Sequence, residues 1–303
     1  MLEKSPVSST ELLQKLDGLM DRVDGILDRL HGTSSQDEGI FEESTAFRWV
    51  RHEIHGRIEP IRHPDLVDLQ DLIGLDRELT LLSRNTEQFV RGLPANNVLI
   101  WGERGTGKSS TVKGFLDRFA DQGLRMIEVQ KGDLRDLPAI VDLIWDRPER
   151  FILFCDDLSF DEGETDYREL KALLEGSLSA RPNNVLIYPT SNRRHLMPDR
   201  FRDNTPRFDP DDDEIHPQEG VEERVSLSDR FGLSLGFYRI DQDTFLQIVG
   251  HWVSKRNLSI DPETVRSEAL QWLQRTSGRS GRVARQFVDD LTGRLHLRDG
   301  GTE

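Results

Sequence analysis

A glycine-rich turn that ends in a lysine constrains this chain more than any other feature. Gly102, Gly107, Lys108 and Ser109 fit the spacing G-x-x-x-x-G-K-[ST] of a phosphate-binding P-loop. The preceding run, 97–101, is apolar like a buried parallel strand, and apolar residues at helical spacing follow the motif. Glycine lets backbone N–H groups close on phosphate oxygens, and a helix N-terminus adds partial positive charge. The alternative is a glycine-rich turn before an ordinary helix.

The motif also predicts the ligands. In a P-loop, Lys108 would reach the β- and γ-phosphates of ATP, and the hydroxyl group of Ser109 would bind Mg²⁺. The loop residues expected to bind the nucleotide are Gly102, Glu103, Arg104, Gly105, Thr106, Gly107, Lys108, Ser109 and Ser110.

Composition limits the class of protein. The 303 residues are 31% charged and 35% hydrophobic, as in a soluble protein of one large or two smaller domains. No apolar run predicts a membrane span, and the first residues do not resemble a signal peptide. Cys155 is the only cysteine, so we expect a reducing cytoplasm and no intramolecular disulfide. The net charge of −15 argues against a surface that coats nucleic acid, although it does not exclude a local basic groove.

Strand and helix patterns alternate from 65 to 240, which predicts an α/β domain with a parallel sheet. Only helices are expected in the C-terminal region, 241–303. The expected strands are 97–101, 125–129, 151–156, 185–190 and 234–238. The expected helices are 76–91, 108–121, 137–146, 166–178, 242–256, 262–276 and 280–294.

The first 64 residues are expected to form an N-terminal helical region. Apolar residues at heptad spacing predict an amphipathic helix over 8–31, which either packs on its own protein or docks a partner. A polar linker, 31–39, precedes a second expected helical stretch from Phe41 to Ile54. Farther along, 209–223 holds eight acidic residues and no Lys or Arg, which indicates a solvated loop or a docking site for a basic partner.

Two carboxylates follow the apolar run 150–155, where a P-loop protein carries its Walker B motif. Asp156 is expected to help hold Mg²⁺, and Asp157 to orient or deprotonate the attacking water. Many such ATPases have Glu at the second position. Asp is one methylene shorter, so hydrolysis would be slow or would need a shifted water. A helix cap or a loop is the alternative role for this pair.

Asn192 follows the next apolar strand and could hydrogen-bond the γ-phosphate or the lytic water, the alternative being a turn residue. The neighbouring Arg193 and Arg194 could contact another subunit's nucleotide, nucleic acid or solvent.

Two further arginines are candidates for contact with phosphate. Arg230 precedes an expected strand and could reach a nucleotide bound to the next subunit, or it could pair with a carboxylate such as Asp229. Arg282 and Arg285 lie on similar sides of an expected helix. Arg282, in its first turn, is the better candidate to contact the γ-phosphate, unless it is an ordinary solvated arginine.

Together these segments resemble an AAA+ ATPase over about 65–295. "DLIGLDRE", 71–78, resembles the segment that lines the adenine pocket, with Ile73 and Gly74 as its contacts. Asn192 matches the family's sensor 1, "SDRF" resembles an arginine-finger box that includes Arg230, and "SGRVAR" resembles the sensor 2 helix with Arg282. More closely, "GERGTGKSS", "DDLSF", "TSNRRHL", "LSDRFGL" and "GRSGR" resemble an uncharacterised bacterial AAA+ family, known as a domain of unknown function.

This resemblance implies a five-stranded parallel sheet in the order 5-1-4-3-2, a helical lid, and nucleotide between them. AAA+ proteins usually act as rings, often hexamers, so Arg230 would act in trans on a homo-oligomer. The chain departs from the family at Asp157, which replaces the usual Glu. It also shows no aromatic-hydrophobic-glycine pore loop over 130–150, which weakens a substrate-threading function.

Two functions of different classes remain. The first is an oligomeric ATPase that remodels or loads an unidentified macromolecular partner, for which a protein is favoured over nucleic acid. The second is an adaptor or switch that binds ATP with little hydrolysis and presents its N-terminal helix to a partner. A P-loop kinase is disfavoured because no acceptor pocket is evident. Loading of a helicase on DNA is a further alternative, because Arg193 and Arg194 could contact nucleic acid. The acidic net charge argues against it.

Overall fold

The computed structural model describes residues 39–51, 56–161, 164, 167–175, 182–194, 196, 227–276 and 278–299. The expected amphipathic helix 8–31 and the acidic segment 209–223 lie outside the described residues. The described elements, in chain order, are α2 (Ile40–Glu43), β1 (Ala46–Arg51), β2 (Gly56–Pro60), η1 (Leu69–Asp71), α3 (Asp76–Val90), β3 (Val98–Gly102), α4 (Lys108–Phe119), η2 (Ala120–Gln122), β4 (Leu124–Glu128), η3 (Lys131–Asp136), α5 (Leu137–Ile144), β5 (Arg150–Cys155), α6 (Tyr167–Glu175), β6 (Val185–Ser191), β7 (Leu233–Phe237), α8 (Gln242–Lys255), α9 (Pro262–Gln274) and α10 (Gly281–Asp299).

The strands form one seven-stranded sheet in the order β2-β1-β4-β5-β6-β3-β7. All neighbouring pairs are parallel except β1 and β2, which are antiparallel. The part from β4 to β7 has the strand order that the AAA+ resemblance implies. The expected α/β P-loop fold is therefore confirmed, with two strands more than the five expected.

The extra strands correct the expectation of a helix from Phe41 to Ile54, and of an N-terminal region that is helical throughout. Along β1, Phe47 and Trp49 are buried while Arg48 is exposed, which is the alternation of a strand with one face on the core. The ring of Trp49 covers Gly56 on β2, where an added Cβ would lie 1.8 Å from the ring. Pairing with β4 satisfies the backbone of β1, so a contact distant in sequence decides the structure here.

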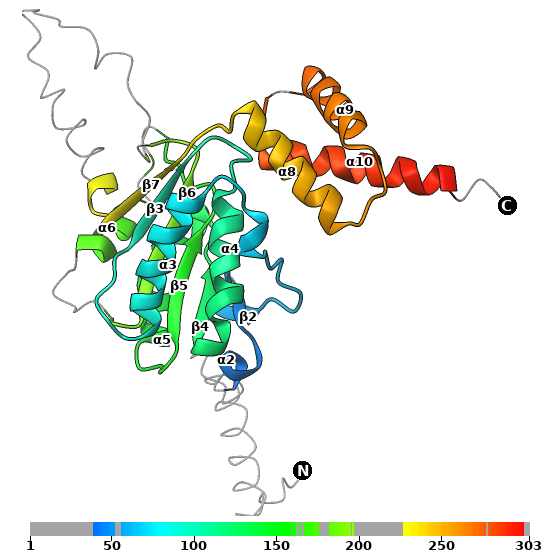
Figure 1. Cartoon of the computed structure of the whole chain (residues 1–303). Helices are drawn as coiled ribbons and strands as arrows, with labels where there is room; N and C mark the ends of the chain where they lie inside the picture. Colours follow the sequence, from blue (N-terminus) through cyan, green and yellow to red (C-terminus); the bar gives the residue numbers. More distant parts are fainter. Residues whose placement is uncertain are drawn as a thin grey trace, which may run out of the picture.

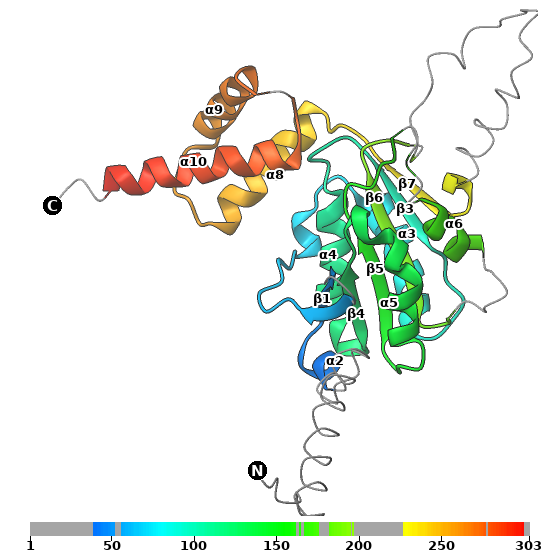
Figure 2. The same ribbon diagram turned by 180° about the vertical axis from the view of Figure 1, so that it is seen from behind.

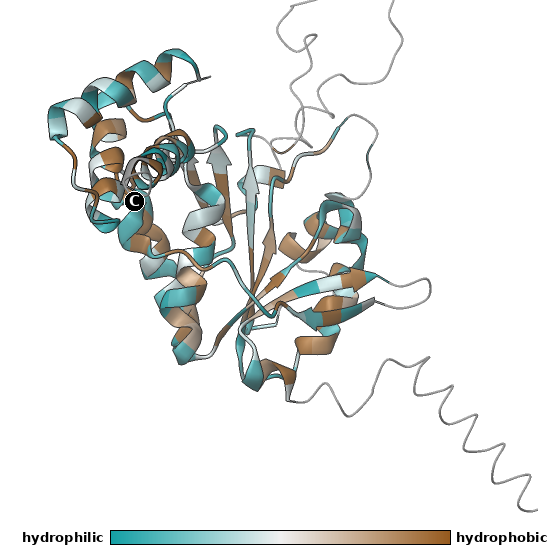
Figure 3. Ribbon diagram, turned by 90° about the vertical axis from the view of Figure 1, so that its right-hand side faces the viewer, coloured by the Kyte–Doolittle hydropathy of each residue, from teal (hydrophilic) through white to brown (hydrophobic). Residues whose placement is uncertain are grey.

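Helices cover both faces of the sheet and make three layers. Helices α3 and α4 pack on one face (Figure 1), and α5 and α6 pack on the other (Figure 2). The strands between them are brown, and so hydrophobic, over much of their length in Figure 3, and their buried residues belong to clusters on both faces of the sheet. This arrangement fixes the carboxyl ends of β3, β5 and β6 at one edge of the sheet.

Helices α8, α9 and α10 form a separate bundle beyond β7, with its own hydrophobic cluster around Phe245 and Phe287 (Figure 1). Asp241 accepts a hydrogen bond from the backbone N–H of Thr244 and so caps α8, and Asp261 caps α9 in the same way. We call these three helices the lid. None of the helices in the described part of the chain is long and apolar enough to cross a membrane.

Candidate nucleotide-binding site

The P-loop joins the end of β3 to the start of α4, as its sequence predicts. Gly102 has φ +144°, and an added Cβ there would lie 1.9 Å from the carbonyl oxygen of Phe237. Gly105 and Gly107 also have positive φ, +79° and +100°. These conformations favour glycine, and they let the loop curl in front of the N-terminus of α4.

Lys108 is nearly buried, with 7% of its surface exposed. Its ammonium group donates hydrogen bonds to the carbonyl oxygens of Gly102 at 2.7 Å and Glu103 at 2.8 Å, and to Oδ1 of Asn192 at 3.0 Å. Burial lowers the pKa of Lys108; Asp157 and Asp156 act against this shift, and nearby arginine charges add to it. These three oxygen atoms thus hold the ammonium group of Lys108 in place beside the P-loop.

Ser109 and Asp156 lie within hydrogen-bond distance of each other. The hydroxyl group of Ser109 donates to Oδ1 of Asp156 at 2.5 Å, although β5 and the P-loop are far apart in sequence. Thr190, on β6, donates to the same oxygen at 2.5 Å. A hydroxyl and a carboxylate oxygen are ligands that Mg²⁺ prefers, so the donor set at this position fits that ion.

Asp157 has an unusual backbone for a residue with a side chain, with φ +52°. Its backbone N–H donates to Oγ1 of Thr190 at 2.9 Å, and its carboxylate accepts a hydrogen bond from Nδ2 of Asn192. Its carboxylate also lies 3.7 Å from Nη2 of Arg104. A left-handed residue other than glycine persists where its surroundings determine it, and such residues cluster at functional sites.

A cavity of 660 Å³ opens between the P-loop and the lid. This volume lies in the ordinary range for a small-molecule site, which suits a nucleotide. The expected residues that line it are Ile73, Arg104, Gly105, Thr106, Gly107, Lys108, Ser109, Ser110, Asp156, Asp157, Asn192 and Arg282. The structure therefore brings most of the candidate residues to one place.

Part of the cavity lining is apolar. Ile73 packs against the hydrophobic cluster of the lid, and Ile240, Ile248 and Trp252 from the lid side line the same cavity. Apolar lining residues suit a nucleotide base, while the polar residues of the P-loop suit its phosphates.

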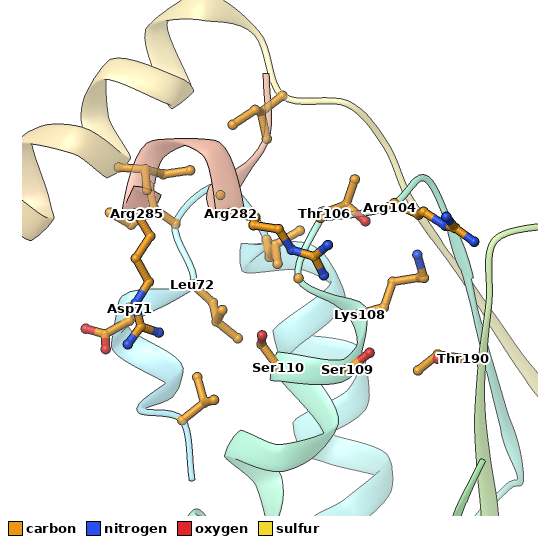
Figure 4. A pocket seen from close by; sticks show the side chains of 18 of the residues that line it. Asp71, Leu72, Arg104, Thr106, Lys108, Ser109, Ser110, Thr190, Arg282 and Arg285 are labelled. Atoms are coloured by element: carbon orange, nitrogen blue, oxygen red, sulfur yellow. The ribbon is translucent and has the colours of Figure 1, made fainter. Parts of the chain in front are cut away.

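The lid also supplies positive charge. Arg282 and Arg285, in the first turns of α10, both point into the cavity (Figure 4). Arg282 extends toward the P-loop, whereas the guanidinium group of Arg285 lies 5.0 Å from the ring centre of Trp252. The N-terminal end of α10 touches the P-loop, because an added Cβ on Gly105 would lie 2.9 Å from Oγ of Ser280.

Four candidates lie outside the lining of this cavity, namely Gly74, Gly102, Glu103 and Arg230. Gly102 and Glu103 face Lys108 through their carbonyl oxygens. Gly74, with φ +80°, faces the lid instead, since an added Cβ would lie 2.7 Å from Cγ2 of Thr244.

Arg230 lies at the opposite end of the sheet from the P-loop. Phe237, at the end of β7, pairs with Gly102, whereas Leu233, at its start, pairs with Val98. Arg230 precedes Leu233 and lines a second cavity, of 630 Å³, at the amino ends of the strands. The length of β7, about 13 Å, separates it from its own P-loop.

Sequence reasoning missed the residues that support the site from a distance. Thr190 was not singled out, although it belongs to the polar strand tip that contains Asn192. Asp71, in η1, was also missed. It accepts hydrogen bonds from His251 at 2.8 Å and from Lys255, both on α8, and so joins the segment before the P-loop to the lid. No local signal could have found a contact across 180 residues.

The P-loop, the carboxylates at the end of β5, Asn192 at the end of β6 and the helical lid define an AAA+ P-loop ATPase fold. Within that class, the chain belongs to the family described as "Protein of unknown function (DUF815)", whose model matches residues 42–295. None of the curated proteins matches the chain.

Several solved AAA+ structures are similar in fold. DnaA from Aquifex aeolicus with bound AMPPCP is 15% identical, with a TM-score of 0.50 over 76% of this chain and 66% of that one. A RuvB variant from Thermotoga maritima is 15% identical, with a TM-score of 0.45 over 74% and 72%. The AAA domain of FIGL-1 in complex with ADP is 19% identical, with a TM-score of 0.46 over 73% and 70%.

Proposed function

We propose that this chain is an ATPase that binds Mg-ATP between the P-loop and the lid. In this proposal, hydrolysis takes place within an assembly of identical chains and drives the remodelling or loading of a macromolecular partner. The observation that carries the proposal is one connected set of hydrogen bonds. It joins Lys108 through Asn192 to Asp157, and Thr190 links Asp157 to Asp156, which accepts from Ser109. A simple phosphate-binding turn would not need these carboxylates.

Each residue of the site would have its own role in binding or hydrolysing ATP. Lys108 and Arg282 would hold the phosphates, and Ser109 and Asp156 would hold Mg²⁺, whose charge offsets that of the phosphates when it is bound. Asp157 would orient the attacking water or take its proton, and Asn192 would position that carboxylate. Ile73 would contact the base in the apolar part of the cavity.

The position of Arg230 supports a shared site. It cannot reach the phosphates in its own chain, because it lies at the amino end of β7 and the P-loop lies at the other end. A neighbouring chain in a ring or partial ring would place it on the next nucleotide, where such an arginine can raise the rate by about 10³–10⁵. We further propose a protein partner and a cytoplasmic location, since the net charge is −15 and the only cysteine is Cys155.

A mixing experiment tests the shared site. Steady-state ATP hydrolysis is measured against protein concentration, with light scattering to follow assembly. We expect turnover to rise with assembly and to be lost in Lys108→Ala and in Arg230→Ala. A mixture of equal amounts of these two variants should regain activity, about a quarter of wild type for random neighbours, because some interfaces then combine an intact P-loop with an intact arginine.

Other variants and outcomes complete the test. Arg91→Ala removes an exposed arginine that pairs with Glu87 on α3 and should leave turnover unchanged. Turnover that does not depend on concentration or on Arg230 would refute the shared site. Absence of ATP binding by the wild-type chain would refute the whole proposal.

A nucleotide-dependent switch is the second candidate. The observation that favours it is the set of partners of Asp157, whose short side chain is engaged by Asn192 and lies beside Arg104. In this second function, the contact with Asn192 would hold the carboxylate away from the attacking water. This function would give tight ATP binding with negligible turnover even in the assembled protein, and robust turnover would exclude it.

A further inference from the structure

Arg104 is a cation of the P-loop for which the common motif has no role. It lines the same cavity as Lys108 and Arg282, and Figure 4 shows it on the side of the cavity toward Thr190. Its side chain is 78% exposed. Within the described part of the chain, its only ion-pair or hydrogen-bond partner is Asp157, whose Oδ2 lies 3.7 Å from Nη2.

The contact between Arg104 and Asp157 is weak by its geometry. The separation of 3.7 Å exceeds hydrogen-bond length, so charge alone holds the two groups together. Both side chains are largely exposed, at 78% and 57%, and water screens such pairs strongly. Asp157 is already engaged by Asn192. Arg104 can therefore leave this partner at little cost.

The space in front of Arg104 is rich in positive charge. Arg104 and Arg282 both act on Lys108 and contribute to lowering its pKa, so the three cations influence the same small volume. Lys108 already has three oxygen partners, whereas Arg104 has one distant carboxylate. A guanidinium group presents several N–H donors in a plane, which matches the oxygen atoms of a phosphate group.

We propose that Arg104 is a phosphate sensor supplied by the P-loop itself. Its guanidinium group moves from Asp157 to the terminal phosphate group of a nucleoside triphosphate, and Asp157 then keeps only Asn192 as a side-chain partner. This inference rests on the proposed function and deepens it. Each chain would thereby distinguish a triphosphate from a diphosphate on its own, before any arginine arrives from a neighbour.

The test compares two nucleotides in the full chain. Affinities for ADP and for the β,γ-methylene analogue of ATP are measured by titration calorimetry in the presence of Mg²⁺. For Arg104→Ala we expect the affinity for the analogue to fall about tenfold or more relative to wild type, because a charge-assisted contact is lost. The affinity for ADP should change less than twofold. Arg104→Lys should recover part of the loss, since it keeps the charge but not the planar donors.

Arg239→Ala is the matched control. Arg239 is likewise an exposed arginine that pairs with a P-loop side chain, Glu103, but it does not line the cavity. The ratio of the two affinities should stay at the wild-type value in this control. An equal loss in Arg239→Ala would show a general effect of charge and would overturn the inference.

Other outcomes separate this inference from the proposed function. Equal losses of affinity for both nucleotides in Arg104→Ala, or no loss, would overturn the role of Arg104 as a sensor. Neither outcome would contradict the proposal that the wild-type chain binds nucleotide. Lys108→Ala should lower the affinity for both nucleotides. It serves as the reference for a residue that does not distinguish a triphosphate from a diphosphate. If the wild-type chain binds neither nucleotide, the proposed function fails, and the inference fails with it.

Discussion

Thr190, on β6, donates a hydrogen bond of 2.5 Å to Asp156, at the end of the neighbouring strand β5. The same hydroxyl group accepts a hydrogen bond from the backbone N–H of Asp157. Because Thr190 is 1% exposed, water cannot replace either contact. One buried side chain therefore sets the positions of both carboxylates.

Replacement of Thr190 by Val should separate this role from packing, since Val has nearly the same shape without the hydroxyl group. We expect Mg²⁺-dependent ATP binding to weaken about 10–100-fold, as for other groups that orient a metal ligand. The free energy of unfolding should fall by about 1–2 kcal/mol, because the N–H group of Asp157 loses its acceptor. Titration with Mg²⁺ at fixed ATP checks this, with Thr190→Ser as the control. A Val variant that matches the Ser variant would contradict the role.

Gly105 should link the P-loop to the lid. In Gly105→Ala, the added methyl group would meet Ser280 at 2.9 Å and push the start of α10 away. Gly123→Ala is the matched control, since Gly123 has a similar φ of +88° but nothing within 4 Å of the added Cβ. Both variants should lose about 1 kcal/mol of stability from the left-handed backbone. Only Gly105→Ala should weaken nucleotide binding, and equal binding by both would argue against the contact.

Asp71 should stabilise the attachment of the lid in a pH-dependent way. Burial acts to raise the pKa of Asp71, but the hydrogen bonds and charges of Lys255 and His251 prevail and hold that pKa below its ordinary value of 3.8. A lowered carboxyl pKa contributes stability above about pH 4, and this contribution is lost as the pH falls through the folded-state pKa. For Asp71→Asn we expect a loss of about 1–2 kcal/mol at pH 7.

Denaturant unfolding at several pH values measures this contribution. The difference between wild type and Asp71→Asn should shrink toward zero in acid. The pKa of Lys255 is raised, mainly by its hydrogen bond to Asp71, so the difference should also shrink in strong alkali, as the pH rises through that pKa. Asp68→Asn, at a more exposed carboxylate 3.7 Å from Lys255, should have a smaller effect. A difference that grows in acid would contradict this account.

Tyr188 should stabilise the contact between β6 and α3. Its fully buried hydroxyl group lies 3.0 Å from Nδ2 of Asn85 and 3.0 Å from Oγ1 of Thr86, and burial raises its pKa to about 12. Tyr188→Phe should lower the free energy of unfolding by about 1–2 kcal/mol, because polar groups of α3 lose a buried partner. Tyr238→Phe removes a hydroxyl from a side chain that is 68% exposed, and should change stability by less than about 0.5 kcal/mol. Thermal unfolding of both variants decides the matter.

The central sheet could be predicted because its strands are local apolar runs that glycine-rich or acidic turns interrupt. The run before Gly102 and the run before Asp156 each form a strand near the expected bounds. The prediction of a helix from Phe41 to Ile54 was wrong, because over so short a stretch the apolar residues fit the spacing of a helix as well as that of a strand. What decides the structure there is the parallel pairing of β1 with β4, about 80 residues away in sequence.

Some residues of the candidate site could likewise be predicted from local sequence patterns, and others could not. Lys108, Ser109, Asp156 and Asn192 each carry a local pattern, and the structure brings these four side chains together. Thr190 and Asp71 carry no pattern of their own, because each acts through a partner on another element. The left-handed backbone of Asp157 was equally hidden, since it depends on a hydrogen bond to β6.

The separation between Arg230 and the P-loop along β7 has a consequence for stoichiometry. In the proposed assembly, a chain offers its phosphate pocket at one end of the strand and this arginine at the other, so a pocket completed by Arg230 would belong to two chains. A row of n chains joined head to tail then contains n − 1 completed pockets, with one pocket and one arginine left over at its ends. Closing this row into a ring would complete the last pocket, so contact of an Arg230 with every pocket would itself report closure.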